Sequence, residues 1–231
     1  MKKKIFNCFI MLALFVSVFS LSSCKKSSLD LGNYLIEERN NLFTGGDSLY
    51  TVTISSGLRE TEYKLDGNLT EMTDFAVLTF SKNNNEPLAN DNYTYIVKID
   101  DESLTGFLVK NPVDNSYVVD LERSVNDDAK VHVEIGFSGY NFKADLTNTS
   151  NDFNVDKNSA LKIATSELKS DVNNVLSDKN VKIEVVMKIL KDYSNVEVKN
   201  YYWYVGVIST NGDTLGILIN ANNGDVVAKK V

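Results

Sequence analysis

The polar and apolar positions divide the chain into four stretches with different periods. Residues 5–21 form an apolar run behind three lysines. From about residue 49 to residue 147, apolar and polar residues alternate with a period of two, which is typical of β-strands. Residues 157–176 instead repeat apolar positions at intervals of three and four, as an amphipathic helix does. The alternation returns between residues 181 and 228, so we expect a mainly β protein with one long helix.

The first alternating stretch predicts an antiparallel β-sandwich over residues 47–150. Its runs are rich in β-branched and aromatic residues, and Asn, Asp, Gly and Ser clusters separate them. The clearest runs are residues 49–54, 75–80, 93–99, 106–109, 117–121 and 131–137. About seven or eight short strands in about 100 residues favour a sandwich of immunoglobulin-like architecture, although no Cys…Trp…Cys core signature is present.

Residues 154–231 predict a separate α+β domain. Asp156 or Asn158 caps the expected helix, and strands follow at residues 181–189, 201–208, 214–220 and 226–228. Asn211-Gly212 is typical of a tight hairpin turn. One helix therefore covers one face of an antiparallel meander. The polar segment 148–154 marks the boundary between the two domains.

Residues 24–46 are expected to form a tether and a marginal helix. Residues 24–28 are polar, while Leu31, Leu35, Leu42 and Phe43 fall near one helical face between residues 30 and 43. Gly32 and the Asn40-Asn41 pair weaken the case for a helix.

The apolar run at residues 5–21 has the character of a secretory signal. As a helix it would span about 25 Å, which is short of the ~30 Å hydrocarbon core. A retained transmembrane helix and an ordinary secretory signal remain the alternatives. The motif Leu21-Ser22-Ser23-Cys24 resembles the lipobox of bacterial lipoproteins. This resemblance implies that residues 1–23 are a lipoprotein signal peptide and that Cys24 carries a diacylglyceryl group.

The resemblance also implies a location in the cell. The body would lie outside the cytoplasm, anchored in the bacterial cell membrane or outer membrane by the acyl lipid on Cys24. Each buried methylene adds about 0.8 kcal/mol of membrane affinity. Lys25 stands where an aspartate retains some lipoproteins at the inner membrane, so delivery to the outer membrane stays open.

Charge and cysteine content exclude several classes of function. Removing residues 1–23 takes away three lysines and no acids, so the formal net charge falls from −7 to −10. An acidic body repels phosphates, which argues against nucleic-acid binding. Cys8 lies in the signal segment, leaving Cys24 as the mature chain's one cysteine. A disulfide framework and a thiolate zinc site are therefore not expected.

The C-terminal third resembles a PepSY domain, a module of secreted peptidase propeptides and bacterial envelope proteins. The likeness rests on Ala160 and Ala164, on Trp203-Tyr204-Val205, and on the strand–turn–strand segment 216–227. Asn220 stands where the family commonly has aspartate, and Asn223 where threonine often precedes the glycine. The resemblance implies a non-catalytic module that restrains or regulates a peptidase by binding it.

Candidate catalytic and metal-binding residues are few. His132 is the single histidine, and alternation places it with Glu134 on the exposed face of a strand. Turn acids at residues 100–102 and 126–128 could supply oxygen ligands to calcium, but neither has the spacing of a calcium loop. We expect solvated turn acids, no catalytic residue, no metal site and no cofactor beyond the lipid.

The aromatic run at residues 201–204 is the candidate partner-binding site. Alternation places Trp203 and Val205 under the helix and leaves Tyr202 and Tyr204 on the open sheet face. Exposed tyrosines bury much area with few rotatable bonds, which suits a contact surface. Lys182, Glu184 and Lys188 are expected to form a polar rim on the neighbouring strand.

The sequence leaves three functions open. The first is a membrane-anchored, non-catalytic envelope lipoprotein that binds another envelope protein, with a peptidase as the partner implied by the PepSY resemblance. The second is a lipoprotein that binds a small molecule or glycan in a cleft between the two domains. The third, for which no residue pair is selected, is a carboxylate-dependent hydrolase.

Overall fold

The structure, a computed structural model, describes residues 29–62, 64–84, 86–89, 92–191 and 200–231. Twelve strands dominate it. They are β1 (Leu35–Gly46), β2 (Tyr50–Glu60), β3 (Met72–Lys82), β4 (Tyr93–Ile99), β5 (Glu102–Lys110), β6 (Tyr117–Asp120), β7 (Val131–Phe137), β8 (Tyr140–Asn148), β9 (Ile183–Lys191), β10 (Tyr201–Ser209), β11 (Thr214–Asn220) and β12 (Val226–Lys230). The helix α2 (Lys157–Val175) and two short 3-10 turns, η1 (Leu31–Tyr34) and η2 (Thr149–Asp152), complete the fold. Within this described part, no helix has both the length and the apolar content to span a membrane.

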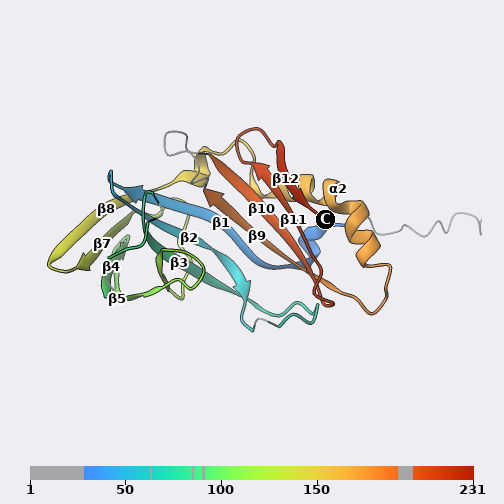
Figure 1. The fold of residues 1–231 in the computed structure, drawn as a ribbon, viewed down its shortest axis with the longest axis horizontal. Helices are drawn as coiled ribbons and strands as arrows, with labels where there is room; N and C mark the ends of the chain where they lie inside the picture. Colours follow the sequence, from blue (N-terminus) through green and yellow to red (C-terminus); the bar gives the residue numbers. More distant parts are fainter. Residues whose placement is uncertain (1–28, 63, 85, 90–91, 192–199) are drawn as a thin grey trace, which may run out of the picture.

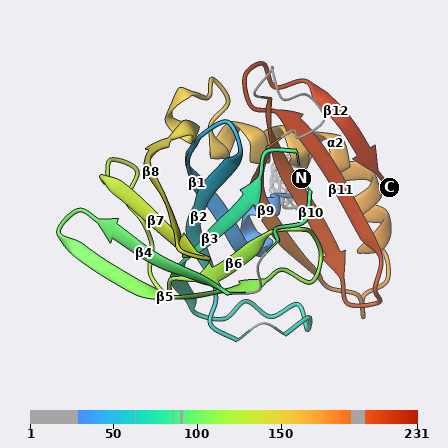
Figure 2. The ribbon, with the colours of Figure 1, turned by 60° about the vertical axis from the view of Figure 1, so that its left-hand side comes forward.

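All twelve strands belong to one sheet, and eight of them close into a barrel. The strand order is β12-β11-β10-β9-β1-β2-β3-β6-β5-β4-β7-β8, and a further pairing joins β8 back to β1. Strands β9 to β12 extend the sheet beyond the barrel, with α2 packed on one face of the extension (Figures 1 and 2).

Strand β1 belongs to both the barrel and the extension. Its first half pairs in parallel with β9, from Leu35 opposite Val185 onward. Its last residues pair with β8, where Phe43 lies opposite Asn148. A bulge between Arg39 and Asn41 separates the two halves and changes which side chains face which side. A bulge bends its strand, so this one lets β1 leave the extension and enter the barrel wall.

Two hydrophobic cores result from this arrangement. The barrel interior is filled by buried side chains from β1 to β8 and the loop before β7, including an aromatic group in which Phe80 contacts Tyr50, Tyr93 and Phe142. The second core lies between α2 and the extension. The helix contributes four buried side chains, Ala160, Ala164, Leu168 and Val172.

The second core also includes residues from the start of the described chain. Leu31 is 0 % exposed and Leu42 is 4 % exposed, and both pack with the core of α2 and β9 to β11. The amide of Leu31 donates a hydrogen bond to the hydroxyl of Thr165 on α2, over 3.3 Å. Residues 29–46 therefore hold the helix against the sheet.

The predicted fold class is wrong, although most of its elements are right. Helix α2 and strands β9 to β12 lie close to the predicted positions. The β-rich region is not a sandwich, because its strands join β1 in a closed barrel. The C-terminal part is not a separate PepSY-like α+β domain, because β9 pairs with β1 and continues the barrel's sheet. Alternation shows that a strand has one buried face and leaves its pairing partners undetermined.

The predicted marginal helix at residues 30–43 is also wrong. The carboxylate of Asp30 accepts a hydrogen bond from the amide of Gly32 and so caps a turn, but only the short turn η1 follows it. The chain then extends into β1. Leu31 and Leu42 are buried in the same core. They reach it from the turn η1 and from strand β1, and not from one face of a helix.

Candidate partner-binding face

The alternation of β10 gives the extension one closed face and one open face. Trp203 and Val205 are 2 % and 0 % exposed in the core beneath α2. The indole Nε1 of Trp203 donates a hydrogen bond to the carbonyl oxygen of Val155, over 2.8 Å. Tyr202 and Tyr204 lie on the opposite side and are half-buried. The structure thus places both tyrosines on the side of the sheet where the sequence predicted them.

We call the side opposite α2 the outer face. It consists of residues that lie opposite one another on neighbouring strands, and such residues share a side of the sheet. Lys188 on β9 lies opposite Arg39 on β1 and opposite Tyr204 on β10. Leu218 on β11 lies opposite Tyr204. The outer face is defined here by Glu37, Arg39, Lys188, Tyr202, Tyr204 and Leu218.

The ring of Tyr204 lies along the sheet because two glycines leave room for it. Gly206 and Gly216 face each other across β10 and β11. A Cβ added at Gly206 would lie 2.6 Å from the Tyr204 hydroxyl oxygen, and one added at Gly216 would lie 3.3 Å from the ring. The ammonium of Lys188 lies 5.8 Å from the ring centroid. An aromatic ring packed over glycines in this way supports a strand that they would otherwise weaken.

Two arginines extend the outer face toward the barrel. The guanidinium groups of Arg39 and Arg59 lie 5.2 Å and 4.7 Å from the ring centroid of Phe75. Phe75 is 0 % exposed, so these planar cations cover it. Each arginine has a carboxylate partner: Glu37 lies 2.7 Å from Arg39, and Asp120 lies 2.5 Å from Arg59. The pairs fix where the two cations sit.

Lys188 differs from the arginines because the ion pairs of the described residues do not include it. Its neighbours on the outer face are the Arg39 cation and the Tyr204 ring. Burial lowers the pKa of Lys188 below its usual 10.5, the charge of Arg39 lowers it further, and Glu37 offsets part of this. The Lys188 ammonium is thus partly desolvated beside a second cation, and the charge of Glu37 offsets only part of that effect.

One end of the outer face is closed, contrary to the prediction for Glu184. This carboxylate was expected in an exposed polar rim, but it is 0 % exposed. Its Oε1 accepts hydrogen bonds from the amides of Asp66 and Gly67, over 3.0 and 2.7 Å. The Lys182 ammonium donates to the side-chain oxygen of Asn68, over 2.6 Å. The segment between β2 and β3 therefore folds over this end of β9.

His132 lies on the outside of the barrel, where the sequence placed it. Its Nδ1 is 2.7 Å from Asp145, and Nε2 is 3.5 Å from Glu134. The Asp145 contact joins neighbouring strands, since His132 lies opposite Asp145 in the sheet, whereas Glu134 is on the same strand as His132. In the described residues, His132 therefore lies between two carboxylates on the outside of the barrel.

The two acidic turns singled out in the sequence line one shallow cavity. Asp100 and Asp127 contribute to a hollow of about 580 Å³ beside His132 and Asp145. Asp100 uses its carboxylate locally, accepting a hydrogen bond from the amide of Lys130 over 3.0 Å. Among the residues that the structure describes, no group of three or more His, Cys, Asp or Glu could hold a metal ion. The arrangement suits solvated turns.

Sequence reasoning identified only part of the outer face. Tyr202, Tyr204 and Lys188 follow from alternation within two strands. Arg39 was missed because its segment was expected to be helical. Arg59 was missed because it lies between the first two clear alternating runs, residues 49–54 and 75–80. The run of charged residues at 37–39 was the available signal.

The proposed signal peptide and Cys24 lie outside the described residues. Comparisons with family models, with curated proteins and with solved structures found no match.

Proposed function

We propose that the protein is a lipid-anchored, non-catalytic envelope protein whose folded body binds another envelope protein through the outer face. The lipobox-like motif ending in Cys24 supports the anchor.

The observation that carries the proposal is the contrast between the two faces of the extension. The side beneath α2 is sealed, with Met187 1 % exposed and Val205 0 % exposed. The outer face has half-exposed tyrosines and paired guanidinium groups held by the sheet. Tyr and Arg are the residues enriched in the energetically dominant parts of protein interfaces. The Tyr204 ring already packs over Gly206 and Gly216, so its contact with a partner costs less side-chain entropy than that of a free tyrosine.

Affinity capture from detergent-solubilised membranes tests the binding role. The full chain is compared with the double variant Tyr202→Ala/Tyr204→Ala. The matched control is Tyr140→Ala, since Tyr140 is 53 % exposed at the start of β8 and lies away from the extension. We expect one partner to be lost from the double variant and retained by the control. Equal recovery of every captured protein by all three chains would contradict the proposal.

The anchor has its own test. Cys24→Ala removes the sulfur that the lipid would occupy, so we expect no lipid incorporation and an unprocessed precursor. Metabolic labelling with a fatty acid and the size of the product on a gel measure both. Normal processing of the variant would exclude the lipobox.

A further inference from the structure

Lys188 and Arg39 form a pair of like charges on an acidic protein. The formal net charge is −7, yet these two cations lie opposite each other on paired strands. Like charges directly opposite in a sheet are destabilising. Glu37 offsets the charge of Arg39, over 2.7 Å, and Lys188 has no such ion pair within the described ranges. The pair therefore leaves positive charge uncompensated in the middle of the outer face.

The surroundings of Lys188 favour an anion that has lost part of its own hydration. The Lys188 side chain is half-buried, and the Tyr204 ring lies beside it at 5.8 Å. A hydrogen bond between an ammonium and a carboxylate is stronger than one between neutral groups. Partial exclusion of water, as at Lys188, strengthens it further. Arg39 lies opposite Lys188 in the sheet, and its fork uses only Nε for Glu37, so its other donors are not taken by that carboxylate.

The sheet also provides a surface for what is attached to that anion. The Tyr204 ring lies flat over Gly206 and Gly216, and Leu218 is the neighbouring half-exposed side chain. A polypeptide can place apolar side chains on this surface while its carboxylate reaches Lys188. An anionic bilayer would instead meet the wider acidic surface, and that contact is repulsive.

We infer that the outer face binds an acidic segment of a partner protein, with a carboxylate between Lys188 and Arg39 and the adjoining chain over Tyr204. This inference rests on the proposed function and specifies the chemistry of the partner. Because the protein's net charge is negative, general electrostatic attraction does not bring a polyanion to it. Binding of an acidic segment therefore has to come from the local site around Lys188.

The probe is a fluorescently labelled synthetic peptide of alternating Glu and Leu, and the matched probe replaces every Glu with Gln. The full chain in neutral detergent is titrated at low salt, with fluorescence anisotropy as the readout. We expect the Glu peptide to bind and the Gln peptide to bind at least about tenfold more weakly.

Variants locate the site. Lys188→Gln should weaken binding of the Glu peptide about tenfold, and Lys188→Arg, which keeps the charge, should retain most of it. The control is Lys98→Gln, which removes the same charge from a different place. Lys98 is an exposed lysine on barrel strand β4. Circular dichroism checks that each variant is folded.

The outcomes separate this inference from the proposed function. Absence of binding at low salt, or equal losses in Lys188→Gln and Lys98→Gln, would overturn the acidic-segment inference. Binding to phosphatidylglycerol vesicles through Lys188, without binding to the peptide, would also overturn it. Capture of a partner that depends on Tyr202 and Tyr204 but is unchanged in Lys188→Gln would overturn this inference and leave the proposed function standing. Peptide binding that depends on Lys188, with no captured partner, would support the site and contradict the proposed function.

Discussion

Glycines decide where the aromatic ring of the outer face can lie. At Gly206 the atom nearest to an added Cβ is the hydroxyl oxygen of Tyr204, the far end of a side chain that can rotate away. At Gly57 the nearest atom is the carbonyl oxygen of Glu38, at 1.8 Å. The same substitution therefore disturbs a side chain at one position and the backbone at the other.

We predict that Gly57→Ala lowers the free energy of unfolding by about 3 kcal/mol, because β1 and β2 must separate to admit the methyl group. Gly206→Ala should change stability by less than about 1 kcal/mol and weaken binding at the outer face by displacing Tyr204. Urea unfolding and peptide titration measure the two effects. Equal stability losses in both variants would contradict this account of the two glycines.

Single residues were the level at which the sequence was most informative. Alternation within β10 separates Tyr202 and Tyr204 from Trp203, because each strand residue points to the side opposite its neighbour. Contacts between distant strands could not be predicted in this way. Arg39, Arg59 and Phe75 come from three strands, and only the register of the sheet brings them together.

Helix α2 begins at the cap Asp156, one of the two cap residues that the sequence left open. Asp156 accepts a hydrogen bond from the amide of Ser159 over 2.6 Å. This hydrogen bond lowers the pKa of Asp156 below its usual 3.8. A carboxyl with a lower pKa in the folded state stabilises the fold above pH 3.8, and that contribution is lost as the pH falls through the lower folded value.

We predict that Asp156→Asn retains the cap at neutral pH, because asparagine is an equally good N-cap, and that it removes this pH dependence. Asp156→Ala should lower the unfolding temperature at neutral pH. Thermal unfolding between pH 2 and pH 7 measures both. If wild type and Asp156→Asn lose stability in parallel on acidification, the cap does not contribute as described.

Strand β1 shows why one element was mispredicted. The bulge between Arg39 and Asn41 breaks the alternation that would have revealed a strand. The remaining apolar residues then matched a helical period by coincidence. The position of a bulge depends on the strands with which the two halves pair. The local pattern of polar and apolar residues therefore does not predict it.

At the scale of the whole molecule, β1 couples the barrel to the extension. Barrel closure rests on two pairs in the register, Phe43 with Asn148 and Thr44 with Thr147. The partners are about 100 residues apart in the chain, and no periodicity reports such a pairing. This is why the sequence predicted most of the strands and an incorrect architecture.

We predict that a fragment of residues 154–231 does not fold cooperatively. It lacks Leu31 and Leu42 from its core, and β9 loses its partner β1. Adding a peptide of residues 29–46 should restore protection of the β9 amides. Hydrogen exchange on the fragment with and without the peptide measures this. A fragment that folds alone would show that the extension is an independent unit.

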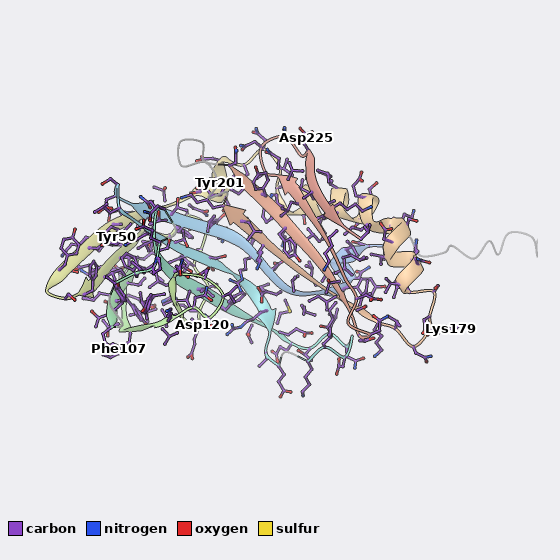
Figure 3. All side chains as sticks on the ribbon, in the orientation of Figure 1. Tyr50, Phe107, Asp120, Lys179, Tyr201 and Asp225 are labelled. Atoms are coloured by element: carbon purple, nitrogen blue, oxygen red, sulfur yellow. The ribbon has the colours of Figure 1, made fainter. Side chains whose placement is uncertain are left out.

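The central claim is that the outer face contacts a partner in the cell envelope. It is tested most directly by placing a photoreactive phenylalanine derivative at Tyr202, Tyr204 or Phe107 in the full chain expressed in cells. Phe107 is 69 % exposed and lies near the barrel end of the molecule, far from Lys179 at the other end (Figure 3). We predict the same protein adduct from positions 202 and 204 and none from position 107. An adduct from position 107 alone, or none from any position, would contradict the account.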